Sequence, residues 1–81
     1  MTEYPIKTPQ QLGSILQGYR RERKLTQQAV GVSVGLAQNA VSQIEADPGP
    51  ASLARIFKVL SALGLELVVR PRKAAGRHPE W

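Results

Sequence analysis

The sequence has no cysteine, only one histidine, and no apolar run long enough to cross a membrane. The absence of cysteine excludes disulfides and thiolate metal sites. A membrane span needs ~18 or more apolar residues in a row, and the first residues lack the basic and apolar regions of a signal peptide. His78 has no thiol, phosphate-binding glycine loop or cluster of metal ligands to act with. We therefore expect a cytoplasmic protein that is not an enzyme and holds no metal or cofactor.

What the sequence does have is positive charge on a short chain. Its 81 residues suffice for one domain, and a hydrophobic fraction of 42% supports a compact core of modest size. The 11 Lys and Arg against 6 Asp and Glu give a net charge of +5, which favours a polyanionic partner but does not choose among DNA, RNA, lipid and an acidic protein. The basic residues gather in two clusters, namely Arg20, Arg21, Arg23 and Lys24, and then Arg70, Arg72, Lys73 and Arg77. Either cluster could instead be a solvated surface.

Capping residues and apolar periodicity predict the first three helices. A capping box with a proline at the first helical position occupies residues 8–11, so a first helix should run from there to about Arg23. Thr26 can cap a short second helix that ends at Gly35, because glycine suits the left-handed conformation that closes a helix. A third helix should span Gln38 to Ala46.

A turn and a fourth helix follow. Residues 47–50 contain two prolines and a glycine, which disfavour helix and favour a turn. Ser52 can cap the fourth helix, which should continue until Gly64. Its apolar positions repeat at the helical period and are Leu53, Ile56, Phe57, Leu60 and Leu63.

Residues 65–70 have the alternation and the β-branched residues of a single strand that Pro71 ends. Because a lone strand needs a partner from another chain, we expect a two-stranded sheet across a homodimer, unless the segment simply extends the fourth helix. The strand residues expected in the dimer are Leu65, Leu67, Val68 and Val69. The predicted fold is thus mostly α, a four- to five-helix domain over residues 1–70 with one C-terminal β-strand, followed by a flexible tail over residues 71–81.

Residues 25–45 carry the pattern on which the functional interpretation depends. Two short helices must cross tightly there, and Gly31 allows their close approach while Gly35 lies at the turn between them. The Leu-Thr-Gln opening, the turn glycine and the closing Ile-Glu resemble the helix-turn-helix of the phage-repressor and Xre class, over about residues 9–64. The resemblance implies a repressor-like helix-turn-helix domain that binds DNA and represses transcription. The apolar contacts between the two helices are expected from Val30, Val34, Leu36, Val41 and Ile44.

The same resemblance assigns residue roles. In this class the second helix of the pair enters the major groove, where glutamine and asparagine amides can engage adenine bidentately. Gln27 matches a glutamine that donates to a phosphate and braces Gln38, and Arg20 and Glu45 match a structural ion pair. Base contacts are thereby expected from Gln38, Asn39, Ser42 and Gln43, and phosphate contacts from Gln27, Arg21, Arg23 and Lys24.

Two positions depart from the class. Ala37 stands where a capping serine or threonine is common, so the start of the third helix must be capped by other means or fray. Ala40 is a weak base reader at its position. The preferred DNA sequence therefore stays open.

A narrower resemblance is to the HipB antitoxins of kinase toxin–antitoxin modules, carried by the Thr-Pro-Gln-Gln-Leu start, the Leu-Glu-Leu segment and the final Glu-Trp. It implies a nucleoid-associated dimer that binds an inverted-repeat operator, autoregulates its operon and binds a HipA-type kinase toxin. Trp81 is the expected toxin contact, because an aromatic side chain on a loose tail can bury a large apolar surface in a pocket. Two alternatives stay open: an Xre-type regulator unrelated to a toxin, and an interaction module that has lost DNA binding.

Overall fold

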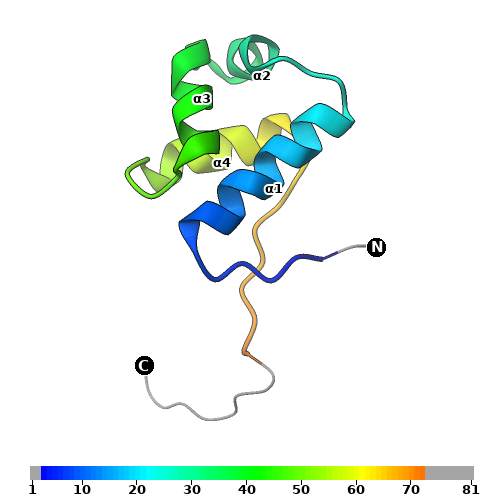
Figure 1. Ribbon diagram of the computed structural model, residues 1–81, viewed down its shortest axis with the longest axis vertical. Helices are drawn as coiled ribbons and strands as arrows, with labels where there is room; N and C mark the ends of the chain where they lie inside the picture. Colours follow the sequence, from blue (N-terminus) through cyan, green and yellow to red (C-terminus); the bar gives the residue numbers. More distant parts are fainter. Residues whose placement is uncertain (1–2, 73–81) are drawn as a thin grey trace.

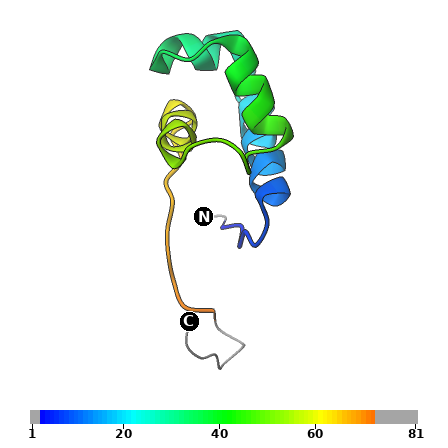
Figure 2. The same ribbon diagram turned by 90° about the vertical axis from the view of Figure 1, so that its left-hand side faces the viewer.

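The computed structural model describes residues 3–72 as four helices joined by short turns. The helices are α1 (Pro9–Glu22), α2 (Gln27–Val34), α3 (Gln38–Ala46) and α4 (Leu53–Ala62). In Figures 1 and 2, α2 and α3 lie at one end of the molecule, and the extended segments before α1 and after α4 lie toward the other. The mostly helical prediction is confirmed. Within the described residues, no helix has the length and apolar character needed to span a membrane.

Side-chain caps determine where three of the helices begin. The Thr8 hydroxyl accepts from the Gln11 amide at 3.2 Å, and the Gln11 side chain accepts from the Thr8 amide at 3.1 Å, which completes the capping box. Thr26 and Ser52 likewise accept from the amides three residues further on. Gly35 ends α2 in the left-handed region, with φ of 76°. These predicted boundaries are confirmed, whereas α1 stops one residue short of its predicted end and α4 ends at Ala62, before the predicted Gly64.

One apolar core joins all four helices. Because every helix or its cap contributes to it, the helices are held by packing as well as by their own propensities. Among the apolar contacts predicted for residues 25–45, Val34 and Leu36 are half-buried and the other three are fully covered. The buried core residues are Leu16, Val30, Val41, Ile44, Ile56, Val59, Leu60 and Leu63.

The outward side of α4 differs from the prediction. Leu53 and Phe57 are predicted apolar positions of the helix, but both are exposed, Phe57 by 47%. Val59, which the prediction omits, is fully buried instead. The apolar stripe of α4 is wider than the surface that the rest of the chain presents to it, so one edge of the stripe stays uncovered.

Residues 65–72 leave the helices as an extended segment, shown in yellow to orange in Figure 2. α4 ends at Ala62, and Gly64 turns the chain away in the left-handed region, with φ of 70°. The alternative of a longer fourth helix is therefore wrong.

Apart from the Leu65 amide, which donates to the Leu60 carbonyl at 2.8 Å, the backbone of this segment has no partner in the described chain. No backbone hydrogen bond within residues 3–72 involves residues 66–72. The predicted strand is thus not formed by one chain alone, and its pairing across a dimer stays a prediction. Residues 73–81, which include Trp81 and most of the predicted tail, lie outside the described residues.

Candidate nucleic-acid interface

The crossing of α2 and α3 depends on two glycines. Gly31 is buried, and a Cβ at this position would collide with the Leu36 carbonyl oxygen. The Leu36 amide donates to the Gly31 carbonyl at 2.8 Å, and Gly35 supplies the left-handed residue of the turn. This short, closed turn fixes the direction of α3 relative to α2.

α3 has one side in the core and another in solvent. Val41, Ile44 and Glu45 are buried, whereas the residues predicted to read bases recur at positions that share the other side of a helix. Among those predicted residues Ser42 is half-buried, and the exposed ones are Gln38, Asn39 and Gln43. Ala37 provides no side-chain cap, as the sequence predicts. The core therefore holds in place a helix whose outer side offers amide donors and acceptors.

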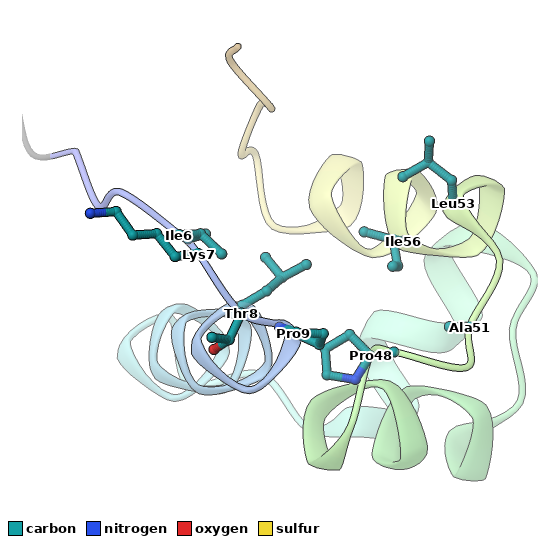
Figure 3. Close-up of a pocket in the computed structure, with 10 residues that line it drawn as sticks. Ile6, Lys7, Thr8, Pro9, Pro48, Ala51, Leu53 and Ile56 are labelled. Atoms are coloured by element: carbon teal, nitrogen blue, oxygen red, sulfur yellow. The ribbon is translucent and has the colours of Figure 1, made fainter. Parts of the chain in front are cut away.

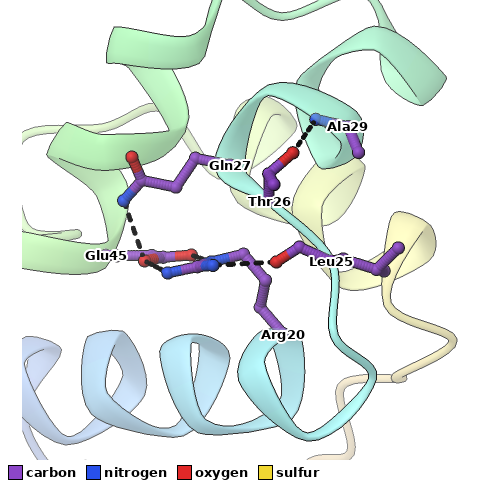
Figure 4. A network of polar contacts seen from close by, with 6 residues as sticks. All are labelled: Arg20, Leu25, Thr26, Gln27, Ala29 and Glu45. Carbon is purple, nitrogen blue, oxygen red and sulfur yellow. Dashed lines mark hydrogen bonds and ion pairs between the residues drawn. The ribbon is translucent and has the colours of Figure 1, made fainter.

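A buried ion pair ties α1 to α3, as Figure 4 shows. Arg20 Nε donates to Glu45 Oε2 at 2.6 Å and Nη2 donates to Oε1 at 3.1 Å, with the two side chains only 11% and 3% exposed. The third nitrogen, Nη1, donates to the Leu25 carbonyl at 2.8 Å. The structure thus brings the two predicted residues together. Since every guanidinium nitrogen and both carboxylate oxygens are engaged, the cost of burying the charges is largely offset.

Gln27 joins the same network from the start of α2. Its Nε2 donates to Glu45 Oε1 at 3.2 Å (Figure 4), so the structure gives this amide a different partner from the predicted one, Gln38. A charged carboxylate is a stronger acceptor than a side-chain amide, and Glu45 keeps free lone pairs after binding Arg20. Nε2 carries a second hydrogen, which leaves Gln27 able to donate to a further group.

The three basic residues in the last turn of α1 and just after it are exposed but differ in their surroundings. Arg21 and Lys24 form no ion pair within the part of the chain that the structure describes. The guanidinium of Arg23 lies against the end of α4, where a Cβ built on Gly64 would be 3.0 Å from Nη1. Arg21 and Lys24 are therefore better placed than Arg23 to contact a phosphate.

A basic residue that the sequence interpretation omits lies beside α3. A concavity of about 350 Å³ opens between α3 and the start of α4, and Gln43, Asp47 and Arg55 all line it. Arg55 is exposed and has no ion pair among residues 3–72. Asp47 is occupied elsewhere, since its Oδ1 accepts from the Gly49 amide at 3.1 Å. Nothing in the sequence spacing signals that Gln43 and Arg55 line the same concavity, because the turn between α3 and α4 brings them to it.

A second concavity of about 370 Å³ lies between the segment before α1 and the start of α4 (Figure 3). Its lining is mainly apolar, from residues such as Ile6, Leu12, Leu53 and Ile56, and Lys7 is the only charged residue in it. It has no set of donors for a phosphate backbone. Among the described residues, no three carboxylate or histidine side chains gather as a metal site.

Comparisons with known proteins match this geometry. A helix-turn-helix family model, HTH_3, matches residues 16–69 of the chain. Antitoxin HipB of Escherichia coli O6:H1 (strain CFT073) is 29% identical over 87 aligned positions, which cover 100% of this chain and 93% of the relative. The similarity therefore extends well beyond the helix pair itself.

Solved structures that contain HipB also resemble most of this chain. A complex of a HipB variant with a 20-mer called O2 superposes with a TM-score of 0.85 at 26% identity, covering 89% of this chain and 100% of the other. The complex of HipA, HipB, O2 and O3 superposes with a TM-score of 0.84 at 27% identity, covering 88% and 100%. These relatives share the arrangement of α1 to α4, including the pair that holds the exposed amides.

Proposed function

This chain belongs to the helix-turn-helix family HTH_3, and from that premise we propose that it is a dimeric DNA-binding antitoxin that represses its own operon and binds a HipA-type kinase toxin. The solved relatives include HipB bound to a 20-mer and HipB assembled with HipA, and their similarity covers nearly the whole described chain. No catalytic role is proposed. A DNA-binding antitoxin of this kind acts in the cytoplasm, at the nucleoid.

One observation carries the DNA-binding proposal: the exposed amides of α3 project from a helix whose other side is buried. Val41 and Ile44 fix the helix axis in the core, so Gln38 and Asn39 need little ordering when they meet base edges in the major groove. An amide offers one donor and one acceptor group, which is the pattern that adenine presents there.

Phosphate contacts would lie on both sides of α3. On one side, Gln27 has a second Nε2 hydrogen to donate, and Arg21 and Lys24 are unpaired in the described chain. On the other side, Arg55 lines the same concavity as Gln43. Backbone contacts on two sides would position α3 in the groove, while the amides read the sequence.

The dimer completes the DNA-binding unit. Two recognition helices related by a twofold axis would read half-sites ~34 Å apart, or a multiple of that, on an inverted repeat. Pairing of residues 65–70 between subunits would hold the two domains in this relation, and the unpaired backbone of residues 66–70 in the described chain supports it. We propose that Trp81, in the tail, docks on the toxin.

The DNA-binding proposal is tested by fluorescence anisotropy with the DNA upstream of the chain's own gene. Gln38→Ala removes a base contact, so affinity for this DNA should fall by about 1–3 kcal/mol while affinity for unrelated DNA is unchanged. Gln10→Ala, which removes an exposed amide at the start of α1, is the matched control. Binding should also weaken steeply as salt rises, through counterion release. Unchanged affinity of Gln38→Ala, or binding that ignores salt, would favour the interaction-module alternative.

The toxin proposal needs a separate measurement. Titration calorimetry with the HipA-type kinase encoded beside this gene should show weaker binding once Trp81 is deleted, because the aromatic contact is lost. Operator affinity should not change. Equal toxin affinity with and without Trp81 would contradict the docking role.

A further inference from the structure

The exposed segment after α4 combines an unpaired backbone with an alternating sequence. Counting from Leu65, one side of an extended chain carries Leu65, Leu67 and Val69, and the other carries Glu66, Val68 and Arg70. Leu65 packs against the core, whereas Leu67 and Val69 are exposed, Val69 by 92%. One side is thus wholly apolar and only partly covered, and the other has opposite charges at its two ends.

We propose that residues 65–70 pair antiparallel with the same residues of a second copy. The register is centred on Val68, which means that Val68 faces Val68 of the partner subunit and Glu66 faces Arg70 of the partner subunit. The proposal rests on the dimer of the proposed function and adds to it the contacts that specify the pairing. The occupant is a second copy because the segment is complementary to itself, as a twofold interface requires.

The alternation of side chains between the two sides of the sheet restricts the possible registers. In an antiparallel pair, directly opposite side chains lie on the same side of the sheet. Only registers centred on a residue place apolar against apolar and polar against polar, whereas a shift by one residue would mix the two sides. The available centres are therefore Leu67, Val68 and Val69.

Charge and apolar contacts together select among the three centres. A centre at Leu67 puts Glu66 opposite Val68 of the partner subunit and leaves both charges without a mate. A centre at Val69 pairs Glu66 with Arg72 of the partner subunit, but it puts Arg70 opposite Val68 of the partner subunit and Leu67 opposite Pro71 of the partner subunit, so apolar contacts are lost on both sides. Only the centre at Val68 pairs Glu66 with Arg70 at both symmetric contacts, and it also sets Leu67 against Val69 of the partner subunit on the apolar side.

Pro71 agrees with this register. In an antiparallel ladder, directly opposite residues alternate between hydrogen-bonded and non-hydrogen-bonded pairs. If Val68 occupies a hydrogen-bonded pair, Leu65 and Pro71 of the partner subunit form a non-hydrogen-bonded pair. Proline is tolerated there because its missing amide hydrogen would not be used.

Dimer formation exchanges one ion pair for another. In the single chain, Arg70 Nη1 donates to Glu3 Oε1 at 2.5 Å, and both side chains are largely exposed. An exposed pair of this kind adds little stability. Arg70 can therefore leave Glu3 for Glu66 of the partner subunit at little cost.

A charge-exchange experiment tests the register. Dimerisation of the full chain is measured without DNA, by sedimentation equilibrium, for Glu66→Arg, Arg70→Glu and an equimolar mixture of the two. Each single variant places like charges opposite one another at both symmetric contacts, so its dimer dissociation constant should rise about tenfold. In the mixture each chain supplies the charge that the other needs, and a heterodimer of wild-type affinity should form.

Two controls exclude other reasons for weaker dimerisation, namely unfolding and loss of the contact with Glu3. Glu66 and Arg70 are exposed, so the fold is retained, and circular dichroism verifies this. The double variant Glu3→Gln with Arg70→Glu should dimerise as poorly as Arg70→Glu alone, since the contact with Glu3 is not the one that matters.

Three results would overturn the inference. Unchanged dimerisation of both single variants excludes the register centred on Val68. A loss confined to Glu66→Arg favours the centre at Val69, where Arg72 of the partner subunit would face Glu66. A wild-type chain that stays monomeric contradicts the proposed dimer as well, whereas a dimer with another register leaves the proposed function intact.

Discussion

The α2–α3 pair and residues 65–70 both carry many apolar side chains, but only the first covers its own. Val41 is fully buried between its neighbours, while Val69 is almost wholly exposed. The helix pair also has its turn closed by internal hydrogen bonds, whereas residues 66–70 have no backbone partner in the described chain. The helix pair is therefore complete in one chain, whereas the C-terminal segment, on our proposal, needs a second one. Stability and dimerisation should respond to different substitutions.

The largest effect should come from breaking the network beneath the helix pair. Glu45→Ala leaves Arg20 buried without its counter-charge and removes the partner of Gln27, so the free energy of unfolding should fall by about 3–5 kcal/mol. Urea denaturation measures this. Glu66→Ala, which removes an exposed carboxylate from the C-terminal segment, should change it by less than about 0.5 kcal/mol. Similar losses in both variants would mean that the two regions are not as different as the structure shows.

Two glycine-to-alanine substitutions should test how much stability depends on the close crossing of α2 and α3. Gly31→Ala drives a methyl group into the Leu36 carbonyl and should cost about 2–3 kcal/mol of unfolding free energy. Gly18→Ala in α1 meets nothing within 4 Å, so it should stabilise the protein by about 0.5–1 kcal/mol. Thermal and urea denaturation of the two variants should give shifts of opposite sign. A stable Gly31→Ala protein would show that α2 and α3 can separate without loss.

An acidic residue on the C-terminal segment should act on dimerisation alone. Val69→Asp places a charge on the apolar side of the proposed sheet, twice in each dimer, and should weaken dimerisation at least about tenfold. Val32→Asp is the control, because Val32 is 73% exposed on α2 and belongs to the region that needs no partner. Sedimentation equilibrium distinguishes them. If both variants dimerise equally well, residues 65–70 are not the contact.

The smallest effect concerns the flank of α3. Arg55→Gln should lower the slope of log affinity for DNA against log salt by about 0.9 for each subunit, because one phosphate contact is lost. Lys58→Gln removes an exposed charge of the same helix that does not line the concavity beside Gln43, so its slope should stay that of the wild type. Anisotropy titrations at several salt concentrations measure both. Equal slopes for the two variants would remove Arg55 from the interface.

Local features of the sequence were sufficient for the helix boundaries. Thr8, Thr26 and Ser52 each cap a helix through an amide three residues away, and Gly35 closes α2 through its own backbone conformation. Such interactions need only neighbouring residues, so the sequence order alone predicts them. The period of apolar residues predicted in the same way that α3 has a buried side and an amide-bearing side.

The sequence by itself determined the helices, their caps and the helix-turn-helix pattern, because these depend on contacts within a few residues. Only the tertiary structure decided that Glu45 rather than Gln38 binds Gln27, that α4 buries Val59 and exposes Phe57, and that Arg55 and Gln43 line one concavity. These outcomes depend on how the helices cross and on the turn that joins α3 to α4. Periodicity identifies the apolar residues of a helix, but the surface available from the rest of the chain decides which of them are covered.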